Sequence, residues 1–260
     1  MNMRSVPAAV AVVSVGCAVL WAAETAPKAG EIHILCSNGM KAVVEQVHPQ
    51  MERAIGHPLS IEFSSTASFK EKIDAGATFD VAILTSEALD TLTQEHKIVA
   101  GTRADAARTG VGIGVRAGAP KPDISTPDKL KQALLKAKSI TYTKNGASAV
   151  FVTRMIDRLG IAAELKPKLI ADTRAGHVSQ AVAEGQAEMV LTLISEILPV
   201  QGVQFVGPLP RELQGYTVLT AGVGAHAKDA DAAKAVVKFL TGPSIEPILK
   251  AKGMEPAPRK

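Results

Sequence analysis

Short apolar runs that are typical of buried strands alternate with amphipathic helical patterns, and this alternation constrains the fold more than any other feature. A strand pattern at 31–36 precedes a helical pattern at 41–55, in which Pro49 predicts a kink. Two further strand and helix pairs follow, at 59–63 with 68–75 and at 80–84 with a helix from Ser86. Because a helical crossover returns the chain to a parallel neighbour, we expect an α/β architecture with mainly parallel strands.

The alternation resumes beyond a linker-like stretch at 118–122. A strand is predicted before it at 109–115. The second set has predicted helices at 126–136, 147–159 and 175–183, and strands at 139–143, 168–171 and 188–192. The remaining predicted elements are too few for a third domain: strands at 204–206 and 217–223, and helices at 229–240 and 244–252. We therefore expect two α/β lobes, one of which is completed by the end of the chain.

The first thirty residues have the layout of an export signal. A basic residue near the amino terminus precedes an uncharged stretch at 8–21, and the small residues Ala22 and Ala23 follow. The stretch is too short to span a bilayer comfortably. We predict a signal peptide at 1–23 and a periplasmic or other extracytoplasmic location, with a lipid anchor at Cys17 as the alternative.

Composition narrows the classes of protein. Apolar residues make up 47% of the 260, which is enough for a core, while aromatic residues make up only 3%. The net charge of +4 is not gathered into a stripe, so we expect no nucleic-acid partner. Once Cys17 is removed, Cys36 has no internal disulfide partner, and stability must come from the core.

Loops at the carboxyl ends of four predicted strands carry the polar residues of a candidate binding site. Each loop is rich in hydroxyls, amides and glycine, and each opens a helix whose free N–H groups favour an anion. Ordinary helix capping accounts for any one of them. Convergence of all four would predict a small anionic or strongly polar ligand, held largely by neutral donors. The loops are CSNG at 36–39, SSTAS at 64–68, KNGAS at 144–148 and TRAGH at 173–177.

Signatures of enzymes and of metal sites are weak or absent. The chain has no G-x-S-x-G elbow and no phosphate loop, and its histidines neither pair at helical spacing nor cluster with cysteine. The glycine-rich stretch 110–114 opens no helix, which favours a tight turn or a hinge. Cys36 is either a nucleophile or, in the favoured interpretation, a buried small residue. His177 is either a surface residue or a ligand contact. We expect no catalytic residue, no metal ligand and no cofactor.

Three stretches carry a family resemblance: IHILCSNGMKAVVEQV from residue 32, IEFSSTASFKEKIDAGATFDVAILTS from residue 61, and VVKFLTGPSIEPILKAKGMEP from residue 236. Together they resemble the molybdate-binding-protein-like family of periplasmic solute-binding proteins of ABC transporters, over about 31–256. The resemblance implies a two-lobed periplasmic-binding-protein fold of type II. Each lobe would be a mainly parallel sheet flanked by helices, with the ligand cleft between the lobes. The implied lobes are 30–112 plus 204–260, and 113–203.

The resemblance also implies positions for the ligand contacts. The family's first oxyanion-binding serine matches Asn38, and its serine-rich turn matches 65–68. Backbone donors before two helices of the second lobe fall near 147–148 and 176–177, and the family's tyrosine falls at 192–193, where this chain has no tyrosine. The implied ligand-binding set is Ser37, Asn38, Ser65, Thr66, Ser68, Asn145, Ala147, Ser148, Gly176, His177 and Thr192.

The function implied by the resemblance is that of an extracytoplasmic solute-binding protein, which captures a small molybdate-like oxyanion and presents it to an ABC permease. The asparagine and the missing tyrosine leave a small organic anion, a carboxylate or a phosphonate, as the alternative. Lys144, Arg174 and His177 would then supply charge-assisted hydrogen bonds. An envelope enzyme that uses Cys36 or His177, and a ligand sensor for a membrane signalling protein, remain further alternatives. We expect a monomer.

Overall fold

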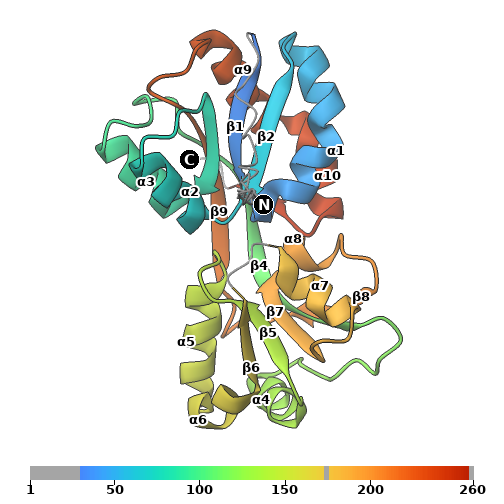
Figure 1. Ribbon diagram of the computed structural model, residues 1–260. Helices are drawn as coiled ribbons and strands as arrows, with labels where there is room; N and C mark the ends of the chain where they lie inside the picture. The colour runs from blue at the N-terminus through green and yellow to red at the C-terminus, as the bar shows by residue number, and fades with distance from the viewer. Residues whose placement is uncertain (1–29, 173–175, 258–260) are drawn as a thin grey trace, which may run out of the picture.

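The computed structural model describes residues 30–172 and 176–257, so the predicted signal peptide, Cys17 and Arg174 lie outside the described residues. Strands and helices alternate as the sequence predicts (Figure 1). The strands are β1 Ile32–Ser37, β2 Leu59–Ser64, β3 Val81–Thr85, β4 Ala104–Arg116, β5 Ile140–Thr143, β6 Leu169–Asp172, β7 Met189–Leu193, β8 Val203–Pro208, β9 Tyr216–Val223 and β10 Glu255–Pro256. The helices are α1 Asn38–Ile55, α2 Thr66–Asp74, α3 Ser86–Gln94, α4 Pro127–Lys136, α5 Ala149–Leu159, α6 Ala162–Leu165, α7 His177–Ala183, α8 Ile194–Ile197, α9 Ala230–Leu240 and α10 Glu246–Ala251.

The strands form one continuous sheet in the order β2-β1-β3-β9-β4-β7-β5-β6, with β8 and β10 also paired to β4. The pairs of β1 with β2 and β3, and of β5 with β6 and β7, are parallel, as the alternation predicts. Strands β4 and β9 run antiparallel to their neighbours. The predicted α/β class is confirmed, with two parallel sets joined through an antiparallel centre.

Strand β4 links the upper and lower parts of the molecule in Figure 1. It pairs with β9 as far as Gly110, and from Val111 onward with β7 and β8. At the change of partner, the Gln214 side chain both accepts from the Val111 N–H and donates to the Val111 carbonyl, each at 2.9 Å. The amide thus satisfies a buried backbone position as a neighbouring strand would.

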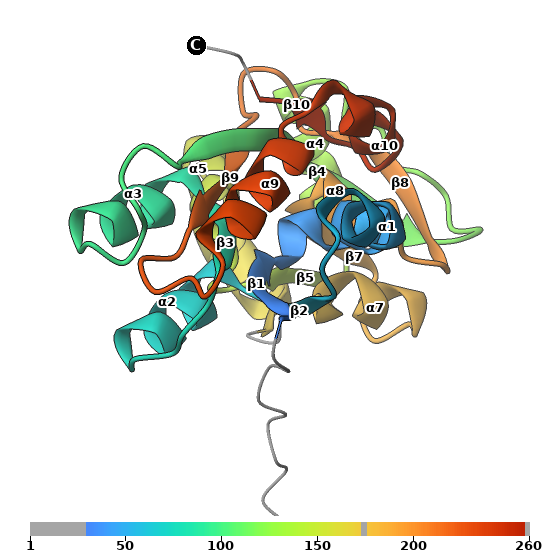
Figure 2. The same cartoon turned by 90° about the horizontal axis from the view of Figure 1, so that it is seen from above.

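The upper sheet has helices on both faces, because alternate strand residues point to opposite sides. Ile34 and Ile83 lie in a core with α1, α9 and α10, whereas Leu35 and Leu84 lie in a core with α2 and α3. Figure 2 shows α2 and α3 on one side of these strands and α1 on the other. Burial on both faces explains why these strands appear in the sequence as continuous apolar runs.

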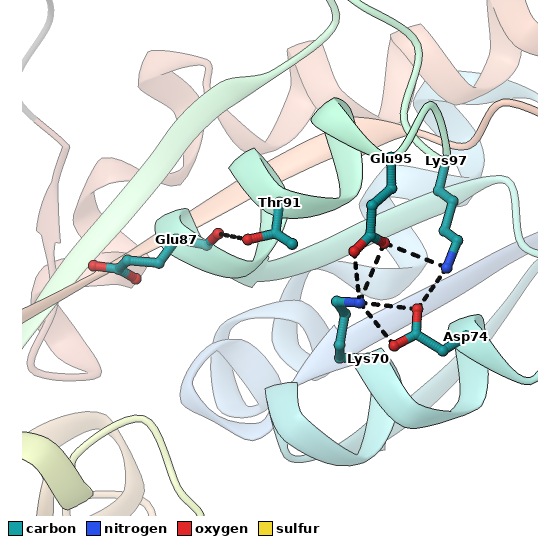
Figure 3. A network of polar contacts seen from close by, with 6 residues as sticks. All are labelled: Lys70, Asp74, Glu87, Thr91, Glu95 and Lys97. Atoms are coloured by element: carbon teal, nitrogen blue, oxygen red, sulfur yellow. Dashed lines mark hydrogen bonds and ion pairs between the residues drawn. The ribbon is translucent and has the colours of Figure 1, made fainter.

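A surface ion network ties α2 to the segment that follows α3 (Figure 3). The Lys70 ammonium donates to Asp74 at 2.7 Å and to Glu95 at 3.0 Å, and Lys97 pairs with both carboxylates. These hydrogen bonds hold the pKa values of Asp74 and Glu95 below their usual range. Because the groups lie at the surface, water and salt screen the attraction.

The lower sheet is also covered on both faces. Val111, Ile113 and Leu191 pack with α4 and α5, and Val190 packs with α7 on the opposite side. Strand β8 and the following turn pack on this lower part, whereas Leu219 of β9 lies in the upper core. The predicted lobes, 30–112 plus 204–260 and 113–203, stay a prediction. From these contacts we propose that the chain returns to the first lobe near residue 215.

The glycine-rich stretch 110–114, for which the sequence favours a tight turn or a hinge, forms no turn, and the hinge stays a prediction. It lies inside β4, with no left-handed backbone angle. A Cβ on Gly112 would lie 2.7 Å from Phe205, and one on Gly114 would lie 2.8 Å from Val203 and 2.9 Å from Ile197. Glycine is therefore required because α8 and β8 approach this face of the strand closely.

Candidate functional site

A small cavity lies where loops of the upper and lower parts meet, at the carboxyl ends of parallel strands. Its volume is about 10 Å³, so a ligand larger than a water molecule requires the walls to move apart. We call it the inner cavity. It brings together six of the predicted site residues with three others, and its lining is Ser37, Asn38, Ser65, Thr66, Thr143, Gly146, Ala147, Gly176 and Glu196.

The upper wall of the inner cavity consists of two helix starts. Ser37 precedes α1, and its side chain makes no capping hydrogen bond, which leaves its hydroxyl for a ligand. Ser65 caps α2 by accepting from the Ser68 N–H at 3.1 Å, and Thr66 accepts from the Thr85 N–H at 3.3 Å. A hydroxyl that accepts from the backbone still has an O–H to donate. This wall therefore offers neutral donors to an anion.

The lower wall follows β5 and the start of α7. A Cβ on Gly146 would lie 2.8 Å from Thr143, so only glycine permits this tight turn. Gly176 has a φ of +80°, a conformation that glycine adopts without strain, and it lies next to the Asn38 amide across the cavity. The two parts of the molecule thus meet around the same small space.

Five predicted site residues do not line the inner cavity. Ser68 and Asn145 are exposed, as is Lys144. Ser148 and Thr192 are buried, with their hydroxyl oxygens 3.5 Å apart. The predicted roles of all the site residues as ligand contacts stay predictions, including that of His177, which lines a neighbouring cavity.

Glu196 is the functional candidate that the sequence reasoning missed. It lies in α8, directly beyond β7, and its carboxylate accepts a hydrogen bond from the Thr192 hydroxyl. Burial raises the pKa of the Glu196 carboxyl above its ordinary value, and the Thr192 hydrogen bond offsets part of that rise. Its position after a predicted strand, at the edge where the other loops gather, was the available signal. Thr192 lies at the place expected for the family's tyrosine, and its hydroxyl donates a hydrogen bond to a carboxyl group.

A second, larger cavity adjoins the first and shares Asn38, Gly176 and Glu196 with it. Its volume is about 580 Å³. We call it the outer cavity. It lies between α1 of the upper part and α7 and α8 of the lower part, and its other lining residues are Lys41, Ala42, Glu45, His177, Gln180, Ser195, Pro199, Val200 and Gln201.

Cys36 is fully buried, as its favoured interpretation predicted. Burial raises the pKa of the thiol, and the charge of Glu45 raises it further, so the reactive thiolate is disfavoured. Burial therefore disfavours a role for Cys36 as a nucleophile. In the part of the chain that the structure describes, no three His, Cys, Asp or Glu side chains gather as a metal site. Nor does any helix there combine the length and apolar character needed to cross a membrane.

Sequence comparisons relate this chain to one protein family and to two individual proteins. Residues 32–255 match the sequence model of the family described as bacterial extracellular solute-binding protein. The chain is 28% identical over 234 residues to an aconitate isomerase of a Pseudomonas species, covering 86% of this chain and 87% of that protein. It is 27% identical over 237 residues to the molybdate-binding protein ModA of Azotobacter vinelandii, covering 88% and 91%.

The molybdate-binding relative also shares the fold. The solved structure of the periplasmic molybdate-binding protein of Azotobacter vinelandii superposes with a TM-score of 0.75 at 18% identity. The match covers 88% of this chain and all of that one. The periplasmic-binding-protein fold expected from the sequence is therefore confirmed.

Proposed function

Because the chain belongs to the family of bacterial extracellular solute-binding proteins, we propose that it captures a small organic acid in the inner cavity and delivers it to an ABC permease. The observation that carries the proposal is the inner cavity itself, to which both parts of the molecule contribute polar groups. A ligand that contacts both walls binds the closed arrangement better than an open one. Binding therefore shifts a hinge equilibrium toward the closed form, which a permease can recognise.

An organic acid accounts for the lining better than the molybdate-like oxyanion that the resemblance implies. The raised pKa of Glu196 favours its protonated form, which can donate a hydrogen bond to a ligand carboxylate. The outer cavity also opens directly beside Glu196, and an inorganic oxyanion in the inner cavity would leave it unfilled. The aconitate isomerase relative, by its name, acts on an organic acid, while the molybdate-binding relative keeps the oxyanion as the competing ligand.

Thermal unfolding of ligand-stripped protein tests the proposal. We expect mono-, di- or tricarboxylates to raise the melting temperature, because a ligand at 100 times its Kd adds about 2.7 kcal/mol of stability. Molybdate, tungstate and sulfate should give smaller shifts. Asn38→Ala should reduce the carboxylate shift, whereas the distant Lys234→Gln should not. A shift with molybdate and none with any carboxylate would restore the oxyanion and overturn the proposal.

A second candidate function is isomerisation of a bound unsaturated acid, which the likeness to an aconitate isomerase favours. Among the described residues of the inner cavity, Glu196 is the one titratable side chain. As a carboxylate it would take a proton from one carbon of an allylic unit. It would then return that proton to the carbon two positions away while the double bond moves, so the atoms balance.

Chromatography of cis- and trans-aconitate after incubation with the protein tests this candidate. Isomerisation by the natural chain and its loss in Glu196→Gln, with binding retained, would support an enzyme. Tight binding of aconitate without conversion would leave the binding function alone.

A further inference from the structure

The outer cavity lies beside the inner one without a wall between them, since Asn38, Gly176 and Glu196 line both. One face of α1 contributes to it, because Asn38, Lys41 and Glu45 recur at helical spacing. A ligand that occupies the inner cavity therefore has room to extend along α1. The two cavities together form an elongated site.

A buried hydroxyl without a partner marks the outer cavity as built for polar contact. Ser195 lines it and is only 2% exposed, yet its hydroxyl has no hydrogen-bond partner among the described residues. Leaving a buried polar group unpaired costs about 1–3 kcal/mol. A polar ligand group in the outer cavity would remove that cost.

Two basic side chains line the same cavity from opposite sides. Lys41 projects from α1 and is half exposed, with Glu45 as a loose partner at 3.8 Å. His177 lies at the start of α7 and is exposed. Glu45 and Glu196 are the acidic groups of the lining. An acidic ligand group would compete with Glu45 for the Lys41 ammonium, and it would add hydrogen bonds from His177 and Ser195.

We propose that the outer cavity is a second subsite, which binds a second acidic group of the ligand through Lys41, His177 and Ser195. The inference rests on the proposed function and narrows its ligand class to di- and tricarboxylic acids. The first carboxylate occupies the inner cavity beside Glu196, and the second lies along α1.

Isothermal titration calorimetry with acetate, succinate and tricarballylate tests the subsite. We expect the di- and tricarboxylates to bind at least about tenfold more tightly than acetate, which corresponds to about 1.4 kcal/mol. Lys41→Gln and His177→Gln should each weaken succinate binding several-fold, and the double variant should abolish the preference for succinate. Glu45→Gln should strengthen succinate binding, because it frees the Lys41 ammonium. Lys234→Gln, which removes the same charge on the distant helix α9, is the matched control.

The outcomes separate the subsite from the proposed function. Equal affinities for acetate and succinate, or equal losses for both in the double variant, would overturn the subsite and leave organic-acid capture standing. Binding of molybdate with no binding of any carboxylate would overturn the proposed function and the subsite with it. Because Lys41 and His177 are exposed, their variants should fold, and an unchanged circular dichroism spectrum checks this.

Discussion

The carboxyl group of Glu196 lies at the junction of the two cavities, with the Thr192 hydroxyl as its donor and Ser148 behind that hydroxyl. In this partly buried chain of polar groups, the Thr192 hydroxyl donates to the carboxyl, and either hydroxyl can donate in the contact between Ser148 and Thr192. A protonated Glu196 presents a donor to the ligand, and an ionised one presents a negative charge. In the proposed function, the protonation state of this one residue sets the charge that the inner cavity presents to a ligand.

The pH dependence of stability should reveal the raised pKa of Glu196. The pKa of the Glu196 carboxyl is raised in the folded protein. Its contribution to folding stability is therefore fully present below the pKa of an unfolded glutamate, about 4.3, and is lost as pH rises through the folded-state pKa. Glu196→Gln should therefore gain stability relative to the natural chain as pH rises from 4 to 8. Urea unfolding across that range measures the difference. A pH-independent difference for Glu196→Gln would contradict the raised pKa.

Six of the residues expected at the site lie around one cavity because the edge of a parallel sheet is predictable from strand and helix alternation. Glu196 was missed for a physical reason. Helix α8 has only four residues, too few to show a helical period, and it enters the site through its packing against α1 and β4. Ser68 and Asn145 belong to the right loops but point elsewhere, since the orientation of a loop side chain depends on its tertiary neighbours.

The composition of strand β4 reflects its packing in both the upper and the lower part of the molecule. It pairs with β9 in the upper part and with β7 and β8 in the lower part, and its alternate residues Val111, Ile113 and Val115 fill the lower core. Gly112 and Gly114 alternate with them and face α8 and β8, where only a residue without a side chain fits. The sequence predicted only 109–115 of this strand, because residues 104–108 lack a continuous apolar run. Helix α1 continues through Pro49 as one helix, and the predicted kink there stays a prediction.

A methyl group on Gly114 should destabilise the protein through this packing. The new Cβ would lie 2.8–2.9 Å from side chains of β7, α8 and β8. We expect Gly114→Ala to lower the free energy of unfolding by about 1–3 kcal/mol, the usual cost of overpacking. Gly207→Ala in β8 is the matched control, because its Cβ would meet only an ordinary contact with Ile124 at 3.5 Å. Urea unfolding of both variants measures the two losses in free energy of unfolding. Equal losses would contradict the prediction, because they would show that β8 and α8 shift to make room for the methyl group.

At the scale of the whole molecule, two segments connect the upper and lower parts: β4 near Gly110, and the return near Gly215. Gln214 clamps Val111 where the two segments lie side by side. The inner cavity lies between the parts that these segments join. We propose that the two parts rotate about this crossing, because the upper and lower cores are separate clusters.

Small-angle X-ray scattering should detect that rotation. In ligand-free solution we expect a larger radius of gyration than with a saturating carboxylate, since the ligand contributes contacts only in the closed form. Asn38→Ala should leave the radius unchanged at a ligand concentration that closes the natural chain. A radius that does not change while calorimetry shows binding would mean that the site is preformed and the hinge proposal is wrong.

Local patterns by themselves determined most of the strands and helices, the α/β class and the edge at which polar loops gather, because the periodicity of apolar residues and helix capping act over a few neighbours. Only the tertiary structure decided that Glu196 enters the inner cavity, that glycines 112 and 114 serve packing, that β8 pairs in the lower part, and that a second cavity adjoins the first. These features depend on contacts between residues far apart in the chain, which no local pattern records.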